Sequence, residues 1–423
     1  MPDFLCSSAQ REDGSVLFDV LIVGGGLVGV SLARALAGAN VGLSVGLVDA
    51  VAATSVEHPS YDDRAIALAE GSMRILAGLG VAEQLKSQAA PIAQVHVSDR
   101  GHFGFTRLSA EQHGLAALGY VTDARTLGTV LNQVLDSTVG IEQHVPVEVV
   151  GLDSTANHVS LHVRNREDAE ERILSTRLLV AADGGRSRIR ELLSIDFSSH
   201  DYQQSAITAN LTPSRSHAGV AYERFTSSGP MALLPMTDER CGLIWTLPTQ
   251  SANQLQTLDD DDFCEQFGER FGGRLGSIRK LGKRSLYPLT LIRSNEQIRP
   301  RVVLVGNAAQ TLHPVAGQGL NLGLRDVAAL AETIVDTHRD AIDVGDPQRL
   351  AAYHHWRSGD QRATTWFTDN LIRTFSTNFL LLNAARSLGL VLLDSVTPVK
   401  RHFVARATGL AGRQSRLARG VPL

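Results

Sequence analysis

The stretch FDVLIVGGGLVGVSLARALA, residues 18–37, decides the fold of this chain. Its first six residues form a short apolar run, which is typical of a buried parallel strand. A glycine turn follows, and residues 30–37 have the small and apolar composition of a helix that packs on a sheet. Residues 43–48 predict a second strand, which ends at Asp49. A strand, a glycine turn, a helix and a strand form a βαβ unit.

The glycine turn matches the pattern G-x-G-x-x-G of a dinucleotide-binding site. Gly24 permits the tight turn, Gly26 lets the backbone approach a pyrophosphate, and Gly29 lets helix and strand pack closely. The pyrophosphate lies at the start of the helix, where free N–H groups and the helix dipole favour anions. Asp49 stands twenty residues after Gly29, where it can hold a ribose hydroxyl. The pattern does not by itself choose between a nicotinamide and a flavin.

Two later apolar runs also end in small or polar residues. Residues 178–182 lead into Asp183–Gly184, and residues 301–305 lead into Gly306–Asn307. The glycines of the next loop, within residues 313–326, let the backbone approach a flat group. The end of this loop predicts a helix, whose first N–H groups can hold the electron-rich end of a reduced flavin ring. We expect these segments to bind one extended ligand.

Composition restricts the class of protein. The chain of 423 residues has 40 basic and 44 acidic side chains, and its net charge of -4 argues against general nucleic-acid binding. The hydrophobic fraction of 43% is enough for a sizeable core. Three widely spaced cysteines fit neither a disulfide framework nor a zinc site and indicate a reducing compartment. The chain shows neither a secretion signal nor a long apolar span, so we expect a cytoplasmic protein. The sequence contains no convincing cluster of metal ligands, so we expect no metal site.

The chain resembles the FAD-dependent aromatic hydroxylases, which are single-component flavin monooxygenases, and within them the ubiquinone-biosynthesis hydroxylases. The resemblance extends from about residue 18 to about residue 397. It is carried by the stretches DDRAIAL (62–68), VHVSDRGH (95–102), FTSSGPMALLPM (225–236) and GNAAQTLHP (306–314). The last of these, together with the residues up to Asn321, is the most specific.

The resemblance implies an α/β fold with a Rossmann-like FAD-binding domain of the aromatic hydroxylase type, an inserted β-sheet-rich substrate domain and a C-terminal helical region. The expected boundaries are 16–91, 118–197 and 299–345 for the FAD-binding domain, 92–117 and 198–298 for the substrate domain, and 346–423 for the helical region with its basic tail. Short strand-like runs separated by polar turns, at residues 231–235 and 241–246, favour the sheet-rich assignment. The acidic run Asp259–Asp262 is interpreted as a solvated helix start.

The resemblance also implies which residues bind FAD. They are Gly24, Gly26, Gly29, Asp49, Arg64, Arg125, Asp183, Gly184, Gly306, Asn307, Pro314, Gly317, Gln318, Gly319, Leu320 and Asn321. The match at Arg125 is loose. Most relatives have aspartate in place of Asn307; an amide still binds ribityl hydroxyls, and the missing negative charge favours an anionic reduced ring.

The implied reaction uses NAD(P)H to reduce FAD and O2 as the source of the oxygen that enters an electron-rich ring. The cofactor carries the difficult chemistry, and the protein binds, orients and excludes water. We assign no catalytic side chain, although His102, His313, Tyr222 and Arg224 are candidates for assisting loss of the phenolic proton. The arginine-rich segment 185–190 either receives NAD(P)H transiently or is an exposed helix start.

The implied substrate is a methoxyphenol with a polyprenyl tail, which resides in the bilayer. The chain after Asp394 carries six basic and no acidic side chains, and apolar runs at 379–382 and 388–393 precede it. One interpretation is that this region binds peripherally to the inner face of the cytoplasmic membrane or to a biosynthetic complex. The other is that it packs on the body of the protein and ends in a frayed basic segment.

Alternatives to the proposed reaction are hydroxylation of another ring carbon, hydroxylation of a small soluble aromatic compound, a flavin reductase, and a scaffold flavoprotein without turnover.

Overall fold

A row of parallel strands forms the centre of the largest sheet. The computed structural model describes residues 9–10, 16–53, 55, 58–101, 104–313, 317–375 and 395–423. The row has the order β20 (Val302–Leu304), β12 (Glu171–Ala181), β2 (Val16–Val23), β3 (Val45–Val48) and β9 (Ile141–His144). The strands predicted at 18–23, 43–48, 178–182 and 301–305 therefore lie side by side. Because they are parallel, their carboxyl ends meet at one edge.

Helices cover one face of this row. Helices α1 (Leu27–Gly38), α4 (Ala124–Asp136) and α8 (Gln318–Arg339) pack on β2 and its neighbours through one apolar cluster. Val20 and Ile22 of β2 belong to this cluster and are fully buried. Full burial of one such side chain stabilises a fold by roughly 1.5–3 kcal/mol. The opposite face carries a second apolar cluster with β11 (Val159–Asn165), which with β10 (Val147–Ser154) extends the sheet in antiparallel fashion.

A second, mostly antiparallel sheet is built largely from the middle of the chain. Its order is β17 (Ile278–Leu281), β13 (Phe197–Pro213), β16 (Cys241–Pro248), β15 (Gly229–Pro235), β14 (Val220–Thr226), β6 (Gln94–Asp99) and β7 (Phe105–Ser109), and β18 (Ser285–Ser294) also pairs with β13. Helices α6 (Thr249–Thr257) and α7 (Asp260–Phe271) cover one face of it. Asp259 caps α7 by accepting a hydrogen bond from the Asp262 amide at 2.8 Å, so the acidic run is a helix start, as predicted.

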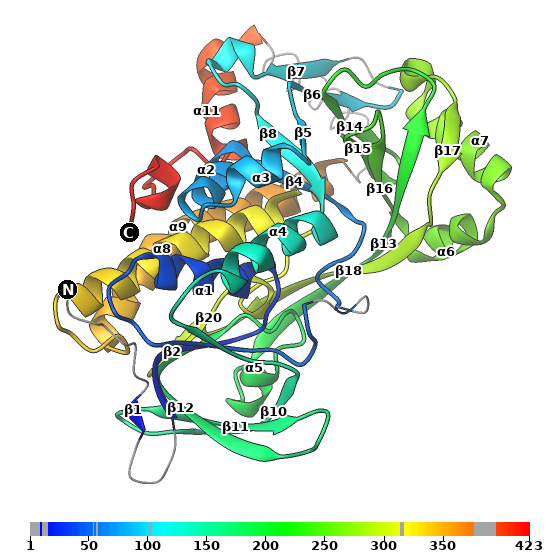
Figure 1. The fold of residues 1–423 in the computed structure, drawn as a ribbon. Helices are drawn as coiled ribbons and strands as arrows, with labels where there is room; N and C mark the ends of the chain where they lie inside the picture. Colours follow the sequence, from blue (N-terminus) through cyan, green and yellow to red (C-terminus); the bar gives the residue numbers. More distant parts are fainter. Residues whose placement is uncertain are drawn as a thin grey trace.

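The two sheets are joined by a small one and flanked by C-terminal helices (Figure 1). The small sheet has the order β4 (Ala65–Ala69), β8 (Gly119–Asp123) and β5 (Ala90–Pro91). Helix α9 (Pro347–Phe375) runs beside α8, and α11 (Thr397–Ala407) lies near β7. This architecture agrees with the predicted fold class. The exact domain boundaries stay a prediction, and the apolar runs at 379–393 lie outside the described residues.

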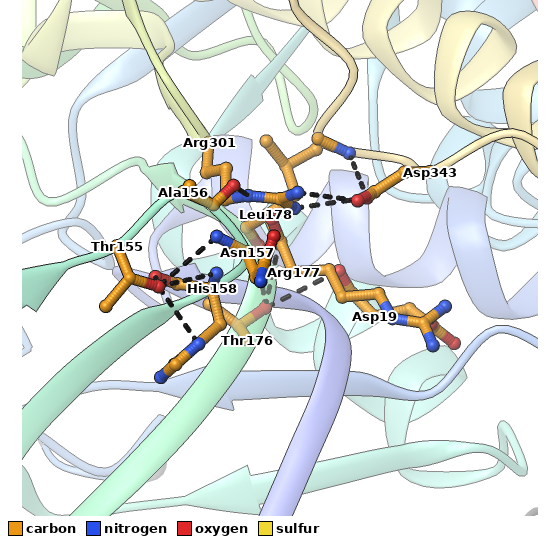
Figure 2. Close-up of polar contacts among 11 residues, drawn as sticks. Asp19, Thr155, Ala156, Asn157, His158, Thr176, Arg177, Leu178, Arg301 and Asp343 are labelled. Carbon is orange, nitrogen blue, oxygen red and sulfur yellow. Dashed lines mark hydrogen bonds and ion pairs between the residues drawn. The ribbon is translucent and has the colours of Figure 1, made fainter.

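Arg301 ties the start of β20 to its surroundings (Figure 2). Its guanidinium donates to the carbonyl oxygens of Ala156 at 2.6 Å and Arg177 at 2.9 Å, and pairs with Asp343 at 2.6 Å. The Arg301 backbone is left-handed, with φ of 60°, which is uncommon for a residue with a side chain. These contacts hold the hairpin between β10 and β11, strand β12 and the segment after α8 in one arrangement.

Replacing Arg301 with alanine is expected to lower the free energy of unfolding by about 2 kcal/mol, because two carbonyl groups and one carboxylate lose the buried guanidinium as their partner. Chemical denaturation measures the loss. The control Arg172→Ala removes an exposed arginine of β12 whose ion pair with Glu170 lies on the surface. An Arg301→Ala protein as stable as this control would contradict the assignment.

Candidate active site

A cavity of about 1660 Å3 lies where the three sheets meet. This volume exceeds that of a typical small-molecule pocket, so the cavity has room for a large ligand and a second molecule. One part of its wall is polar and includes Gly24, Gly26, Asp49, Arg64, Asp183, Gly184, Gly306, Asn307, Gly317, Gln318, Gly319, Leu320 and Asn321. The structure therefore brings most of the predicted cofactor-binding residues together around one space. Pro314 lies outside the described residues.

The glycine turn is as tight as its sequence predicts. Gly24 has a φ of 112°, and a β-carbon there would collide with the carbonyl oxygen of Ala182. A β-carbon on Gly29 would overlap the carbonyl oxygen of Gly24. Gly26 stands at the N-cap of α1 and lines the cavity. The first turn of α1 thus presents its free N–H groups to the cavity, which suits an anionic pyrophosphate.

Asp49 lies beside this turn as a carboxylate. Its oxygens accept hydrogen bonds from the amides of Gly25 and Val51, and His58 Nε2 lies 3.8 Å from Oδ2. Burial alone raises the pKa of Asp49, but the neighbouring His58 imidazole and the hydrogen bonds from the Val51 and Gly25 amides outweigh burial and hold the pKa below its ordinary value. The side chain is therefore ionised at neutral pH and can accept a hydrogen bond from a ribose hydroxyl.

Tyr61 supports the turn, and sequence reasoning missed it. Its hydroxyl donates to the Gly25 carbonyl oxygen at 2.6 Å and accepts from Asn132 Nδ2 at 3.0 Å, while its ring stacks on His58. Burial raises the pKa of Tyr61 to about 12, so the phenol remains a donor. These residues come together only through tertiary packing, and no local motif in the sequence marks them.

Asp183, shortly after the end of β12, has a carboxyl oxygen that can accept a further hydrogen bond. Asp183 Oδ2 accepts from the Ile189 amide at 3.1 Å. Asp183 Oδ1 is buried, and among the residues that the structure describes it has no hydrogen-bond partner. Asp183 lines the cavity, so a ligand hydroxyl can supply the missing donor. Gly184, with a φ of 85°, and Gly306, with a φ of 58°, make the sharp turns that follow β12 and β20.

The arginines of the segment after Gly184 differ in position: one is buried and two line the cavity. Arg190 is buried; it donates to the carbonyl oxygens of Ala308 at 2.9 Å and Gly185 at 2.7 Å. Arg190 therefore has a structural role, and its burial leaves little of its guanidinium accessible to NAD(P)H. Arg186 and Arg188 line the cavity, and Arg188 begins the short helix α5 (Arg188–Leu192). A transient contact of Arg188 with NAD(P)H stays a prediction.

The first turn of α8 closes the polar part of the cavity. Gly317 has a φ of 58° and lies against Ala67 of β4. Asn321 is buried: its Nδ2 donates to the carbonyl oxygens of Ala67 and Gly317, and its Oδ1 accepts from the Ala69 amide, all within 2.6–2.8 Å. Gly319 also lines the cavity, and no atom lies within 4 Å of a β-carbon built on it. This open space is where a flat group can approach the backbone.

Replacing Asn321 with alanine is expected to lower the free energy of unfolding by about 3 kcal/mol, because the Ala69 amide and two carbonyl oxygens lose this partner and each such buried group costs roughly 1–3 kcal/mol. Chemical denaturation measures the change. Asn253→Ala, at an exposed position of α6, serves as the control and is expected to have no effect. A loss below about 1 kcal/mol for Asn321→Ala would show that the amide does not hold the turn.

The two predicted arginines differ in position. Arg64 lines the cavity, with its Nε 2.8 Å from Asp62 Oδ1 and its guanidinium over the Tyr287 ring. Arg125 is not part of the cavity wall; its Nε lies 3.1 Å from Asp63 Oδ1. The structure therefore does not bring Arg125 to the site, and its contact with FAD stays a prediction.

Of the four candidates for proton transfer, Tyr222 and His313 line the cavity, and Arg224 does not. Arg224 donates to the Arg270 carbonyl oxygen on α7, which lies on the far face of the second sheet. Tyr222 packs edge-on against Phe271 of the same helix. Burial lowers the pKa of His313 to about 4, so its imidazole is neutral at pH 7. His102 lies outside the described residues. Within the described part of the chain, no group of His, Cys, Asp and Glu is placed to hold a metal ion.

The remaining wall of the cavity is mostly apolar. It is formed by the face of the second sheet that α6 and α7 do not cover, and by side chains from the C-terminal helices. These residues include Val95, Val97, Leu108, Ala221, Phe225, Ala232, Leu234, Ile244, Phe367, Phe403 and Val404. The cavity thus combines a polar part suited to a nucleotide with an apolar part suited to a hydrophobic molecule.

Several known proteins are similar to this chain in sequence or in fold. The chain matches the protein family described as FAD binding domain over residues 18–368. It is 37% identical to the ubiquinone hydroxylase UbiL of Rhodospirillum rubrum over 96% of this chain and 93% of the relative. It is 28% identical to the 3-demethoxyubiquinol 3-hydroxylase of Escherichia coli over 93% of this chain and 98% of the relative. The crystal structure of p-nitrophenol 4-monooxygenase PnpA from Pseudomonas putida has the same fold, with a TM-score of 0.77, 17% identity and coverage of 94% and 99%.

Proposed function

Because this chain belongs to the family of FAD-dependent hydroxylases of ubiquinone biosynthesis, we propose that it hydroxylates the ring of a polyprenylated methoxyphenol with NAD(P)H and O2 as co-substrates. The protein is an aromatic monooxygenase with FAD as its cofactor, and NAD(P)H is the reductant typical of the family. The observation that carries the proposal is the single cavity in which a nucleotide-binding wall faces an apolar wall.

The residues of the polar wall fit FAD. The start of α1 suits the pyrophosphate, and Asp49 suits the adenosine ribose. Asp183 Oδ1, which is buried without a partner among the described residues, suits a hydroxyl group of the cofactor, and Gly306–Asn307 suits the ribityl chain. The open space over Gly319 suits the flat ring. When bound, FAD supplies the oxidation–reduction chemistry by which O2 is activated.

The chain itself binds, orients and excludes water. The first turn of α8 directs its N–H groups towards the ring site, where they can stabilise negative charge. Val97, Phe225 and Leu234 form an apolar surface on which an aromatic ring and a prenyl chain can pack without polar competition. This division of the cavity supports a hydrophobic phenol as the second molecule.

We also propose that the substrate enters from a membrane surface at the C-terminal region, which docks peripherally on the inner face of the cytoplasmic membrane or on a biosynthetic complex. No helix in the described part of the chain is long and apolar enough to cross a bilayer. Phe403 and Val404 of α11 line the cavity, while Val399 at the start of this helix is exposed. Lys400 and Arg401 add positive charge beside Val399, which favours an anionic lipid surface.

Reversing these charges tests the docking. Truncation is unsuitable because Val404 and Leu417 are buried in the core. A Lys400→Glu/Arg401→Glu protein should bind less to vesicles that contain anionic lipid and keep its activity on a short-chain phenol. Equal vesicle binding by the wild type and this variant would remove the docking proposal without affecting the proposed reaction.

Deletion of the gene tests the proposed reaction. We expect ubiquinone to fall and a prenylated methoxyphenol to accumulate, as identified by mass spectrometry, and the wild-type gene to restore both. Accumulation of a precursor that awaits hydroxylation at a different carbon would instead assign that ring position. Unchanged ubiquinone would exclude a role in the pathway. Normal complementation by a variant that binds no FAD would indicate a scaffold.

A further inference from the structure

Glu223 is the one carboxyl group on the mostly apolar part of the cavity wall that the second sheet forms, among the residues that the structure describes. On β14 it pairs with Ala232 of β15 and with Val97 of β6, both of which line the cavity. Side chains alternate between the two faces of a strand. Ala221 and Phe225 share the face of Glu223 and line the cavity too, whereas Arg224 contacts α7 on the other face. The Glu223 side chain therefore faces the cavity.

This carboxyl group has no protein partner. Among the described residues, Glu223 forms neither an ion pair nor a side-chain hydrogen bond, whereas Asp49 and Asp183 are held by backbone amides. Burial raises the pKa of Glu223 to about 8, so the group is mostly protonated at neutral pH and can both donate and accept. An unpartnered polar group on an apolar wall destabilises the empty protein, so its presence there points to a ligand.

The position of Glu223 relates it to the ring site. Ala221, two residues earlier on the same face, packs in one apolar cluster with Ala67 of β4. The Ala67 carbonyl oxygen accepts from Asn321 Nδ2 in the first turn of α8, and Gly317 lies against the Ala67 side chain. The wall that carries Glu223 is therefore continuous, through β4, with the turn assigned to the flavin ring.

We propose that Glu223 binds the ring hydroxyl of the aromatic substrate and so determines which edge of the ring faces the cofactor. This inference rests on the proposed function and names a specificity-determining residue for it. The apolar neighbours hold the ring and its tail, and the single carboxyl group supplies the polar contact that fixes orientation. A site that hydrogen-bonds a substrate hydroxyl discriminates strongly against a ligand that lacks this hydroxyl.

The test compares a short-chain prenylated methoxyphenol with its methyl ether, which cannot donate a hydrogen bond. The change in flavin absorbance of the holoenzyme on titration gives both dissociation constants. Wild-type protein should bind the phenol at least about 10-fold more tightly than the ether. Glu223→Gln, whose amide also donates and accepts, should keep this preference. Glu223→Leu should bind the two compounds equally and show a raised KM for the phenol.

Two further measurements separate this role from a structural one. Removing a half-buried carboxyl group that has no partner among the described residues should raise the Tm of the Glu223→Leu protein above that of the wild type. Glu265→Leu, at an exposed position of α7, should change neither the preference nor KM. A Glu223→Leu protein that still prefers the phenol, or a wild type with no preference, would overturn the inference and leave the proposed function standing. A wild type that binds neither compound would overturn both.

Discussion

A Gly319→Val protein is expected to bind FAD more weakly while its fold stays intact. No atom lies within 4 Å of a β-carbon at Gly319, and its φ is not in the left-handed region, so the apoprotein can accommodate valine. The new side chain projects into the cavity where the ring is placed. Overpacking costs roughly 1–3 kcal/mol, so FAD affinity should fall up to about 100-fold.

Flavin absorbance after reconstitution measures the affinity, and chemical denaturation of the apoprotein measures the stability. Gly268→Val is the matched control because Gly268 also lies in a helix, α7, with nothing within 4 Å of a β-carbon, but it is remote from the cavity. This control should bind FAD normally. Wild-type affinity in the Gly319→Val protein would show that the ring does not lie against the first turn of α8.

Replacing Arg357 with leucine is expected to lower the free energy of unfolding by about 3–5 kcal/mol. Arg357 of α9 contacts Asp326 of α8 at 2.6 Å, and the two side chains are only 5% and 2% exposed. Burial alone lowers the pKa of Arg357, but the charges of Asp326 and Asp360 outweigh burial and raise it. The leucine variant leaves the Asp326 carboxylate buried, with Gln361 as its remaining hydrogen-bond donor.

A double variant distinguishes loss of the pair from loss of packing. Asp326→Leu/Arg357→Leu should recover most of the stability, because two apolar side chains replace two buried charges. Arg362→Leu on the exposed side of α9 should change the free energy of unfolding by less than about 0.5 kcal/mol. A similarly small effect of Arg357→Leu would contradict the account that this buried ion pair stabilises the packing of α9 on α8.

The fold was predictable wherever a local pattern determines the structure. A buried parallel strand needs a short apolar run, and a turn such as that at Gly24 admits only glycine. The structure of residues 18–49 is therefore predictable from their sequence alone. The same holds for the strand ends at Asp183 and Gly306, because parallel strands bring their carboxyl ends to one edge. The resemblance to the aromatic hydroxylases then indicated which part of FAD each of these segments contacts.

Other features depend on contacts between distant residues. Tyr61 reaches Gly25, and Asn321 reaches Ala67, across separations that no local pattern reveals. The structural role of Arg190 was not predictable, because a cluster of arginines is usually solvated, whereas here the guanidinium satisfies two carbonyl groups inside the fold. The position of Glu223 in the cavity wall was not predictable, because a charged residue in a strand of alternating pattern usually faces water. Its orientation towards a cavity emerges only when the strand is placed in the sheet.

The origin of the oxygen in the product tests the central claim most directly. Purified holoenzyme is supplied with a prenylated methoxyphenol, NAD(P)H and isotopically labelled O2, and the mass of the product is measured by mass spectrometry. We expect one labelled oxygen atom on the ring of each product molecule. Consumption of NAD(P)H without a labelled product, or an oxygen atom that comes from water, would contradict the assignment of this protein as a ring hydroxylase.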